Sequence, residues 1–231
     1  MKPKVSVVMN CLQNQPDWLV VAVDSLLDNR DTVDLQLIIS TVRGDPSIAL
    51  AKARGLEFVT TYRPSIYRQL NAALPLVTGD YFCCVAGNDK TLPDRFIREV
   101  SVLEINEGKK VVYTAFSIAD EDLNITGVNR YRPTYSYSAH LKGNYMADDS
   151  LMRREILDRY APFRQEYGNY AYYDFWLRVA EGEGNVFVYY PEPTWIYRIS
   201  KTSRHIRKKT DTELRALDVR DRAKMLAAHW C

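Results

Sequence analysis

The sequence has no long apolar run and no closely spaced set of metal-binding residues. No segment approaches the roughly 20 apolar residues of a transmembrane helix, and the start, MKPKVSVVMNC, has no stretch long enough for a signal peptide. Metal-ligand spacing is absent from the three histidines and from the four cysteines, which are Cys11, Cys83, Cys84 and Cys231. We therefore expect reduced, buried thiols and a cytoplasmic protein, with peripheral attachment to a membrane left open.

Net charge is also small, at +2 for 231 residues, which excludes a protein whose whole surface attracts nucleic acid. The glycines form no G-x-G-x-x-G loop of the kind that holds phosphates. Positive charge gathers only in the segment 201–209, KTSRHIRKK. Such a run is typical of a solvated face or tail, but it could also bind a diphosphate, an anionic acceptor or nucleic acid.

What is present is a regular alternation of strand and helix patterns. Short apolar, β-branched runs predict buried strands at 5–9, 35–39 and 81–86, and a further strand is predicted at 56–60. Helical spacing of apolar residues follows each of them, at 16–29, 45–55, 64–77 and 93–106. This rhythm predicts an α/β fold with a mostly parallel sheet flanked by helices.

Polar groups follow several of these predicted strands. Asn10 and Thr41 follow the first two, and the turn Gly87-Asn88-Asp89 follows the fourth. Ligands of open parallel sheets bind outside the carboxyl ends of the strands. We therefore expect these residues to converge on one crevice.

The second half has a mixed pattern. It predicts a hairpin at 111–119 and 125–129, helices at 150–160, 173–181 and 211–228, and strands at 186–190 and 194–199. Many of the 16 tyrosines lie between Tyr131 and Tyr197, which suits either stacking on sugars or bases or half-buried strand positions. No linker is evident, so one domain, 1–231, is expected, with halves at 1–107 and 108–205 and a C-terminal basic segment and helix at 206–231.

Five stretches between about residues 4 and 205 resemble the family 2 glycosyltransferases of GT-A fold, most nearly the bacterial enzymes of polysaccharide assembly. They are PKVSVVMNC, SIYRQLNAALPLVTGDYFCCVAGNDKTLPD, SLMRREILDRYAPF, YYDFWLRVA and WIYRIS. The resemblance implies a Rossmann-like nucleotide-binding half and a mixed α+β acceptor half. It also implies inverting transfer of a sugar from a nucleotide diphosphate sugar to a glycan, lipid-linked or other acceptor hydroxyl, in polysaccharide or glycoconjugate synthesis.

The resemblance further implies a divalent metal, manganese or magnesium, at a D-x-D turn after the fourth strand. Here the two acids of that turn fall on Ala86 and Asn88, so Asp89 is the expected metal ligand and metal dependence is expected to be weak. The usual acid after the second strand falls on Thr41, and the usual base position falls on Tyr172.

The remaining site residues are also assigned by the resemblance. Asp174, Asp148 and Asp149 are the expected catalytic acids. The expected donor-binding residues are Asn10, Thr41, Arg63, Tyr67, Asn71, Asn88 and Arg198. Two other functions stay open: a non-catalytic binding module, which the missing acids favour, and a sugar transferase acting on modified nucleic acid.

Overall fold

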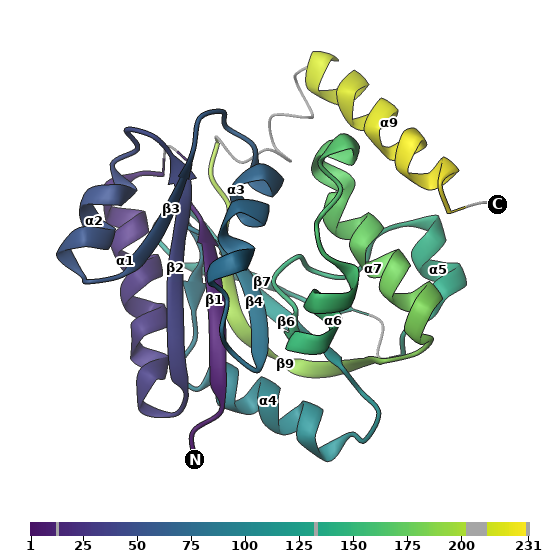
Figure 1. Ribbon diagram of the computed structural model, residues 1–231, viewed down its shortest axis with the longest axis horizontal. Helices are drawn as coiled ribbons and strands as arrows, with labels where there is room; N and C mark the ends of the chain where they lie inside the picture. The colour runs from purple at the N-terminus through teal and green to yellow at the C-terminus, as the bar shows by residue number, and fades with distance from the viewer. Residues whose placement is uncertain (13, 132–133, 202–211, 230–231) are drawn as a thin grey trace.

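Four parallel strands form the N-terminal side of one continuous sheet in the computed structural model, which describes residues 1–12, 14–131, 134–201 and 212–229 (Figure 1). The strands are β1 (Lys4–Asn10), β2 (Asp34–Val42), β3 (Glu57–Thr61) and β4 (Tyr81–Ala86). β1 pairs in parallel with both β2 and β4, and β3 lies outside β2. The parallel half predicted from the sequence is confirmed.

Helices cover both faces of this sheet because successive strand side chains point to opposite sides. In β1, Val5, Val7 and Met9 pack into one core cluster, whereas Val8 packs into the other. The connecting helices are α1 (Pro16–Leu27), α2 (Ser47–Ala53), α3 (Ile66–Ala73) and α4 (Arg95–Ile105), with single turns η1 (Asp28–Asp31) and η2 (Leu74–Leu76). Residues of α1, α2 and α4 join the first cluster, and residues of α3 join the second.

The C-terminal half continues the sheet with mixed pairing. Its strands are β6 (Val111–Ala119), β7 (Ile125–Asn129), β8 (Leu151–Arg153) and β9 (Phe187–Arg198). The short strand β5 (Lys90–Thr91) comes from the first half of the chain and pairs with β9. β8 joins the halves, because it pairs antiparallel with both β4 and β6. β6 and β7 form the predicted hairpin, and β6 also pairs in parallel with β9.

Two sequence predictions in this half are wrong. The strands expected at 186–190 and 194–199 are one strand, β9, because a register shift opposite Thr114 and Ala115 accommodates the intervening prolines. The helix expected at 150–160 begins only at Arg154, as α6 (Arg154–Tyr160). Leu151 and Met152 are fully buried in the sheet instead.

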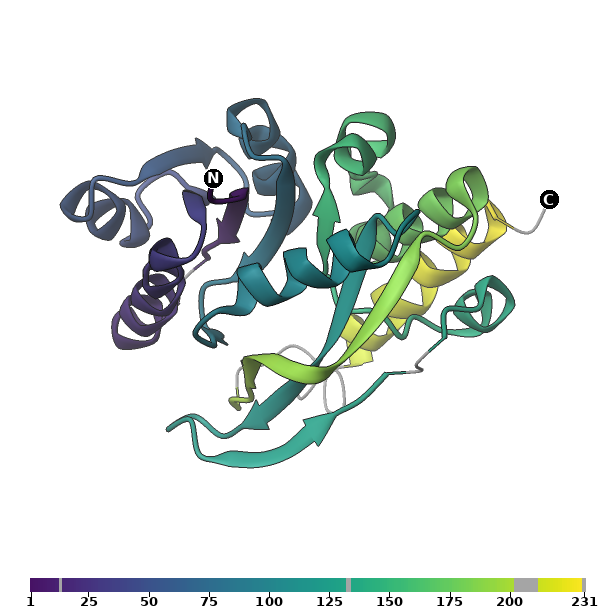
Figure 2. The same ribbon diagram turned by 90° about the horizontal axis from the view of Figure 1, so that it is seen from below.

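The remaining helices gather on the C-terminal side, where α9 lies beside α7 and far from α1 and α2 (Figures 1 and 2). They are α5 (Tyr137–Lys142), η3 (Gln165–Tyr170), α7 (Ala171–Glu183) and α9 (Thr212–Ala227). Met225 of α9 is fully buried in a small cluster with Tyr167, Tyr173 and Leu177. Among the described residues, no helix combines the length and the hydrophobicity that a bilayer crossing requires.

Candidate active site

A cleft of about 600 Å³ opens at the carboxyl ends of β1 and β4 and extends over the C-terminal half. The last residue of β1, Asn10, pairs with the last residue of β4, Ala86, so the two strands end side by side. Five residues predicted for the site line this cleft: Asn10, Asn88, Asp89, Asp148 and Asp149. The structure therefore brings Asp89 together with Asp148 and Asp149, which follow it by 59 and 60 positions in the chain.

The turn after β4 has a tightly fixed backbone. Gly87 donates its backbone N–H to the Asn10 carbonyl at 3.1 Å. A Cβ at Gly87 would meet the side chains of Asn14 and Cys11 at 3.0 and 3.1 Å, so glycine allows the turn to lie close to the β1 loop. Asp89 Oδ1 accepts a hydrogen bond of 2.9 Å from the backbone N–H of Arg198. Burial raises the pKa of the Asp89 carboxyl to about 7.

Arg198 holds this turn by hydrogen bonds and does not line the cleft. Its side chain is buried, its Nε donates to the Asn88 carbonyl at 2.9 Å, and its Nη1 donates to the Glu121 carbonyl at 2.5 Å. The guanidinium also lies 4.8 Å from the ring centre of Trp18. Of the basic segment 201–209, only residue 201 is described, so the other predicted cations of that segment lie outside the described residues.

Asp149 is tied to the core by a buried cation from α4. Arg95 donates from Nη2 to the Asp149 carbonyl at 2.6 Å and lies 3.2 Å from its carboxylate. The same guanidinium pairs with Glu99 at 2.9 Å, and Glu99 accepts a hydrogen bond from Thr194 at 2.7 Å. Burial raises the pKa of Asp149 to about 8. This network fixes the loop that carries both cleft aspartates.

Asp148, in contrast, presents its carboxylate to the cleft. Within the described part of the chain, this carboxylate has no hydrogen-bond or ion-pair partner, and the side chain is exposed to the cleft. Desolvation by the surrounding residues raises the pKa of the Asp148 carboxyl to about 7. An accessible carboxylate with a pKa near neutrality is suited to accept a proton from a bound hydroxyl group.

Asp174 does not reach this cleft. It is fully buried on α7, where Arg178, Arg164 and His229 approach its two oxygens at 2.8, 3.3 and 3.0 Å. Burial alone would raise the pKa of Asp174, but the hydrogen bonds from His229 and Arg178 outweigh it and lower the pKa. Its oxygens are occupied by internal partners, so the arrangement suits the docking of α9 better than proton transfer.

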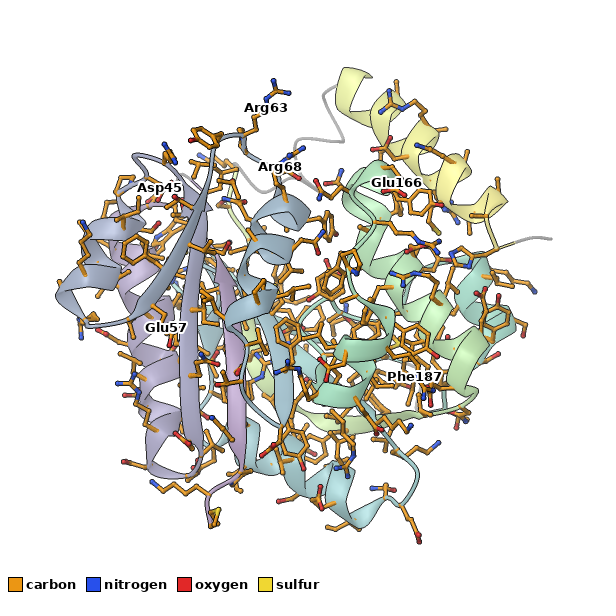
Figure 3. The ribbon with its side chains drawn as sticks, viewed as in Figure 1. Asp45, Glu57, Arg63, Arg68, Glu166 and Phe187 are labelled. Carbon is orange, nitrogen blue, oxygen red and sulfur yellow. The ribbon has the colours of Figure 1, made fainter. Side chains whose placement is uncertain are left out.

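The other predicted donor-binding residues also lie away from the cleft lining. Tyr67 is buried against the rings of Phe163 and Tyr172, at centroid distances of 6.3 and 6.0 Å. Asn71 exchanges two hydrogen bonds, of 2.8 and 3.0 Å, with the backbone of Phe163. Thr41 is fully buried in β2. Arg63 is exposed in the loop that leads into α3, and Arg68 lies on α3 itself (Figure 3).

Several cleft residues were missed by the sequence analysis. Gln69 of α3 is fully buried, and its Nε2 donates to the Cys11 carbonyl at 3.3 Å. Its Oε1 and the Oδ1 of Asn10 have no hydrogen-bond partner among the described residues, although both atoms are buried. The aromatic residues Phe116, Tyr131, Trp195 and Tyr197 line the other side of the cleft. Cys11, Cys83 and Cys84 are free and buried, as predicted.

The cleft offers a partial set of metal ligands. Among the residues that the structure describes, no group of three or more acidic, histidine or cysteine side chains could hold a metal ion. The turn supplies the Asn88 amide oxygen and the Asp89 carboxylate, which are the hard oxygen ligands that Mg²⁺ and Mn²⁺ prefer. Mg²⁺ is commonly held by one or two carboxylates together with substrate phosphates, so the turn fits a metal ion that arrives with a diphosphate.

Comparison with known proteins supports the fold. No protein-family model and no curated protein sequence matches this chain. Solved structures of glucosyl-3-phosphoglycerate synthase from Mycobacterium tuberculosis do match. The complex with Mn²⁺, UDP-glucose and glycerol 3-phosphate has a TM-score of 0.68 at 18% identity, and the match covers 97% of this chain and 79% of that one. The UDP complex has a TM-score of 0.66 at 16% identity, with 97% and 80% covered. These likenesses confirm the predicted GT-A-type α/β fold.

Proposed function

We propose that this protein is an inverting glycosyltransferase that moves a sugar from a nucleotide diphosphate sugar to an acceptor hydroxyl. One observation carries the proposal: the unpartnered Asp148 carboxylate and the Asn88-Asp89 turn line the same cleft, at the carboxyl ends of the parallel strands. In a fold whose solved example binds UDP-glucose, this arrangement supplies both a base and a place for a diphosphate.

The donor would lie across the ends of β1 and β4. The Asn10 and Gln69 side chains line this part of the cleft, where they would contact the donor. Asn88 and Asp89 would hold a divalent metal together with the diphosphate, and a bound metal would neutralise the charge that develops on the leaving group. Arg198 would keep the turn in place through its bond to the Asn88 carbonyl.

The proposed reaction is a single displacement. The Asp148 carboxylate takes the proton of the acceptor hydroxyl as its oxygen forms a bond to the anomeric carbon of the donor sugar. The bond from that carbon to the diphosphate breaks on the opposite side, and the nucleoside diphosphate leaves with the bonding electrons. Attack from the side opposite the leaving group inverts the anomeric configuration. Assembly of a polysaccharide or glycoconjugate is the role that this reaction would serve.

A panel of nucleotide sugars tests the proposal. The full chain is incubated with UDP-glucose and with other UDP-, GDP- and dTDP-sugars, with manganese or with a chelator, and nucleoside diphosphate release and binding are measured. We expect one donor class to bind and to be turned over, with only partial dependence on manganese, because the turn has a single carboxylate. A protein that binds a nucleotide sugar without any turnover would be the non-catalytic module, and one that binds none would refute the proposal.

A further inference from the structure

The cleft has a side that the donor proposal leaves without a role. Phe116, Tyr131, Trp195 and Tyr197, hereafter the aromatic wall, line it together with Asp148 and Asp149. β6 and β9 supply three of these rings. Trp195 and Tyr197 are two positions apart on β9, so they point to the same face of the sheet, and the parallel pairing of β9 with β6 brings Phe116 alongside them.

The rings of the aromatic wall contact one another directly. Phe116 stacks on Trp195 with ring centres 4.5 Å apart and an interplanar angle of 27°. Tyr131 and Tyr197 approach Phe116 at centroid distances of 5.8 and 5.9 Å. Tyr131 and Tyr197 are only half-buried, so ring surface of both remains accessible. Such a surface combines apolar area with hydroxyl groups, which suits a sugar ring that has both C–H and hydroxyl faces.

The charged residues among the described lining of the cleft are all acidic. No lysine, arginine or histidine is among the described residues that line it, whereas Asp89, Asp148 and Asp149 all are. The donor diphosphate would share its negative charge with a metal at Asn88 and Asp89. A phosphate or carboxylate beside Asp148 would meet the like charges of Asp148 and Asp149, and it would find no cation among the described residues that line the cleft.

We infer that the acceptor is a neutral sugar, which lies on the aromatic wall and presents one hydroxyl to Asp148. This inference rests on the proposed function, and it names the substrate class of the same cleft. The wall would contribute apolar contact to the ring. The nearby carboxylate of Asp148 would accept hydrogen bonds from its hydroxyl groups, which are donors as well as acceptors.

Binding to the wild-type chain tests the inference without any substitution. Saturation-transfer NMR is measured with the methyl glycosides of glucose, galactose, mannose and N-acetylglucosamine, each in the presence of the nucleoside diphosphate that binds best in the nucleotide-sugar panel. Glycerol 3-phosphate and 3-phosphoglycerate serve as anionic probes. We expect saturation of at least one neutral glycoside and none of either anion. Saturation of the anions alone, or of no probe at all, would overturn the inference.

Variants of the aromatic wall then locate the glycoside. Tyr197→Leu and Tyr131→Leu should each weaken glycoside binding by about tenfold, since stacking on an accessible aromatic ring is lost. Tyr190→Leu is the matched control, because Tyr190 lies on the same strand as Tyr197 but does not line the cleft. Unchanged glycoside binding in both wall variants would overturn the inference. Nucleoside diphosphate binding is measured on every variant, and its absence from the wild type would instead refute the proposed function.

Discussion

The buried guanidinium of Arg95 donates a hydrogen bond of 2.6 Å to the backbone carbonyl of Asp149, the residue that follows the proposed base. Arg95 is 1% exposed and its partner Glu99 is fully buried, so this ion pair is shielded from water. The pair connects α4 to the loop before β8 and so fixes the loop that carries Asp148. A part of the core thereby determines the geometry of the cleft.

Replacing Arg95 should therefore cost both stability and turnover. Arg95→Met would leave Glu99 as an uncompensated buried charge, which typically costs about 3–5 kcal/mol of unfolding free energy. The double variant Arg95→Met/Glu99→Met should regain most of that loss, because the buried charge of Glu99 is removed together with its partner, but its turnover should stay low because the Asp149 carbonyl has lost its donor. Urea unfolding and steady-state kinetics measure the two effects.

The neighbouring Arg98 is the control for that experiment. Among the described residues, its side chain bonds only the backbone carbonyls of the exposed residues Asp94 and Pro93, so Arg98→Met should change the unfolding free energy by less than about 1 kcal/mol. If Arg95→Met were as stable as Arg98→Met, or if the double variant recovered full turnover, the loop would not depend on this ion pair.

Arg198→Ala should weaken diphosphate binding indirectly. The substitution removes the hydrogen bonds that hold the Asn88 and Glu121 carbonyls and the contact with Trp18. We expect nucleoside diphosphate affinity to fall by about 1.5–3 kcal/mol, the range for a charge-assisted hydrogen bond, with little change for the nucleoside alone. Calorimetry on both ligands measures this. Equal losses for the two ligands would show that the whole cleft has changed and not the turn alone.

The docking of α9 should depend on pH through His229. Burial would lower the pKa of His229, but its hydrogen bonds to Asp174 and Glu181 outweigh this and raise the pKa above 6.5. The stabilisation from His229 is therefore complete below pH 6.5 and is lost as the pH rises through the raised pKa. The pKa of Asp174 is lowered, so the stabilisation of the folded state by its ion pairs is complete above pH 3.8. This stabilisation is lost as the pH falls through the lowered pKa. Arg164 and Arg178 also face this carboxylate.

Thermal unfolding of the wild type and of His229→Gln, at about pH 5.5 and about pH 8.5, checks this dependence. The variant should lose more stability at the lower pH, where the wild-type histidine is charged. Hydrogen exchange of α9 should follow the same trend. An identical loss at both pH values would mean that the imidazole acts by packing and not by charge.

The parallel half of the fold could be predicted because its local patterns and its tertiary structure agree. The strands β1, β2 and β4 are short, mostly buried runs, and each is followed by a helix that packs on the sheet. The pattern failed at Leu151 and Met152, which were assigned to a helix. Their burial comes from pairing with β4 and β6, and no local signal in the sequence reports that distant contact.

The candidate site also contains some residues that local sequence patterns predict and others that they do not. Asn10, Asn88 and Asp89 follow strand ends, and the topology places strand ends at one edge of the sheet. Asp174 was expected from its motif to be catalytic, but Arg178, Arg164 and His229 occupy its oxygens and fix its position in the core. Of these three, only His229 is distant in the sequence. Stacking on sugars was one interpretation of the tyrosines between Tyr131 and Tyr197, but Phe116 and Trp195 gave no local signal, because the pairing of β6 with β9 brings them together.

Turnover of Asp148→Asn, measured with the donor that the nucleotide-sugar panel identifies, tests the central claim most directly. Asp31→Asn, an exposed aspartate on η1, is the matched control. The amide cannot take the proton, so we expect turnover to fall by about a hundredfold or more with donor affinity unchanged. In the wild type, turnover should fall as the pH drops below about 7, because the raised pKa leaves the Asp148 carboxyl protonated there. Turnover of Asp148→Asn equal to that of Asp31→Asn would contradict the account.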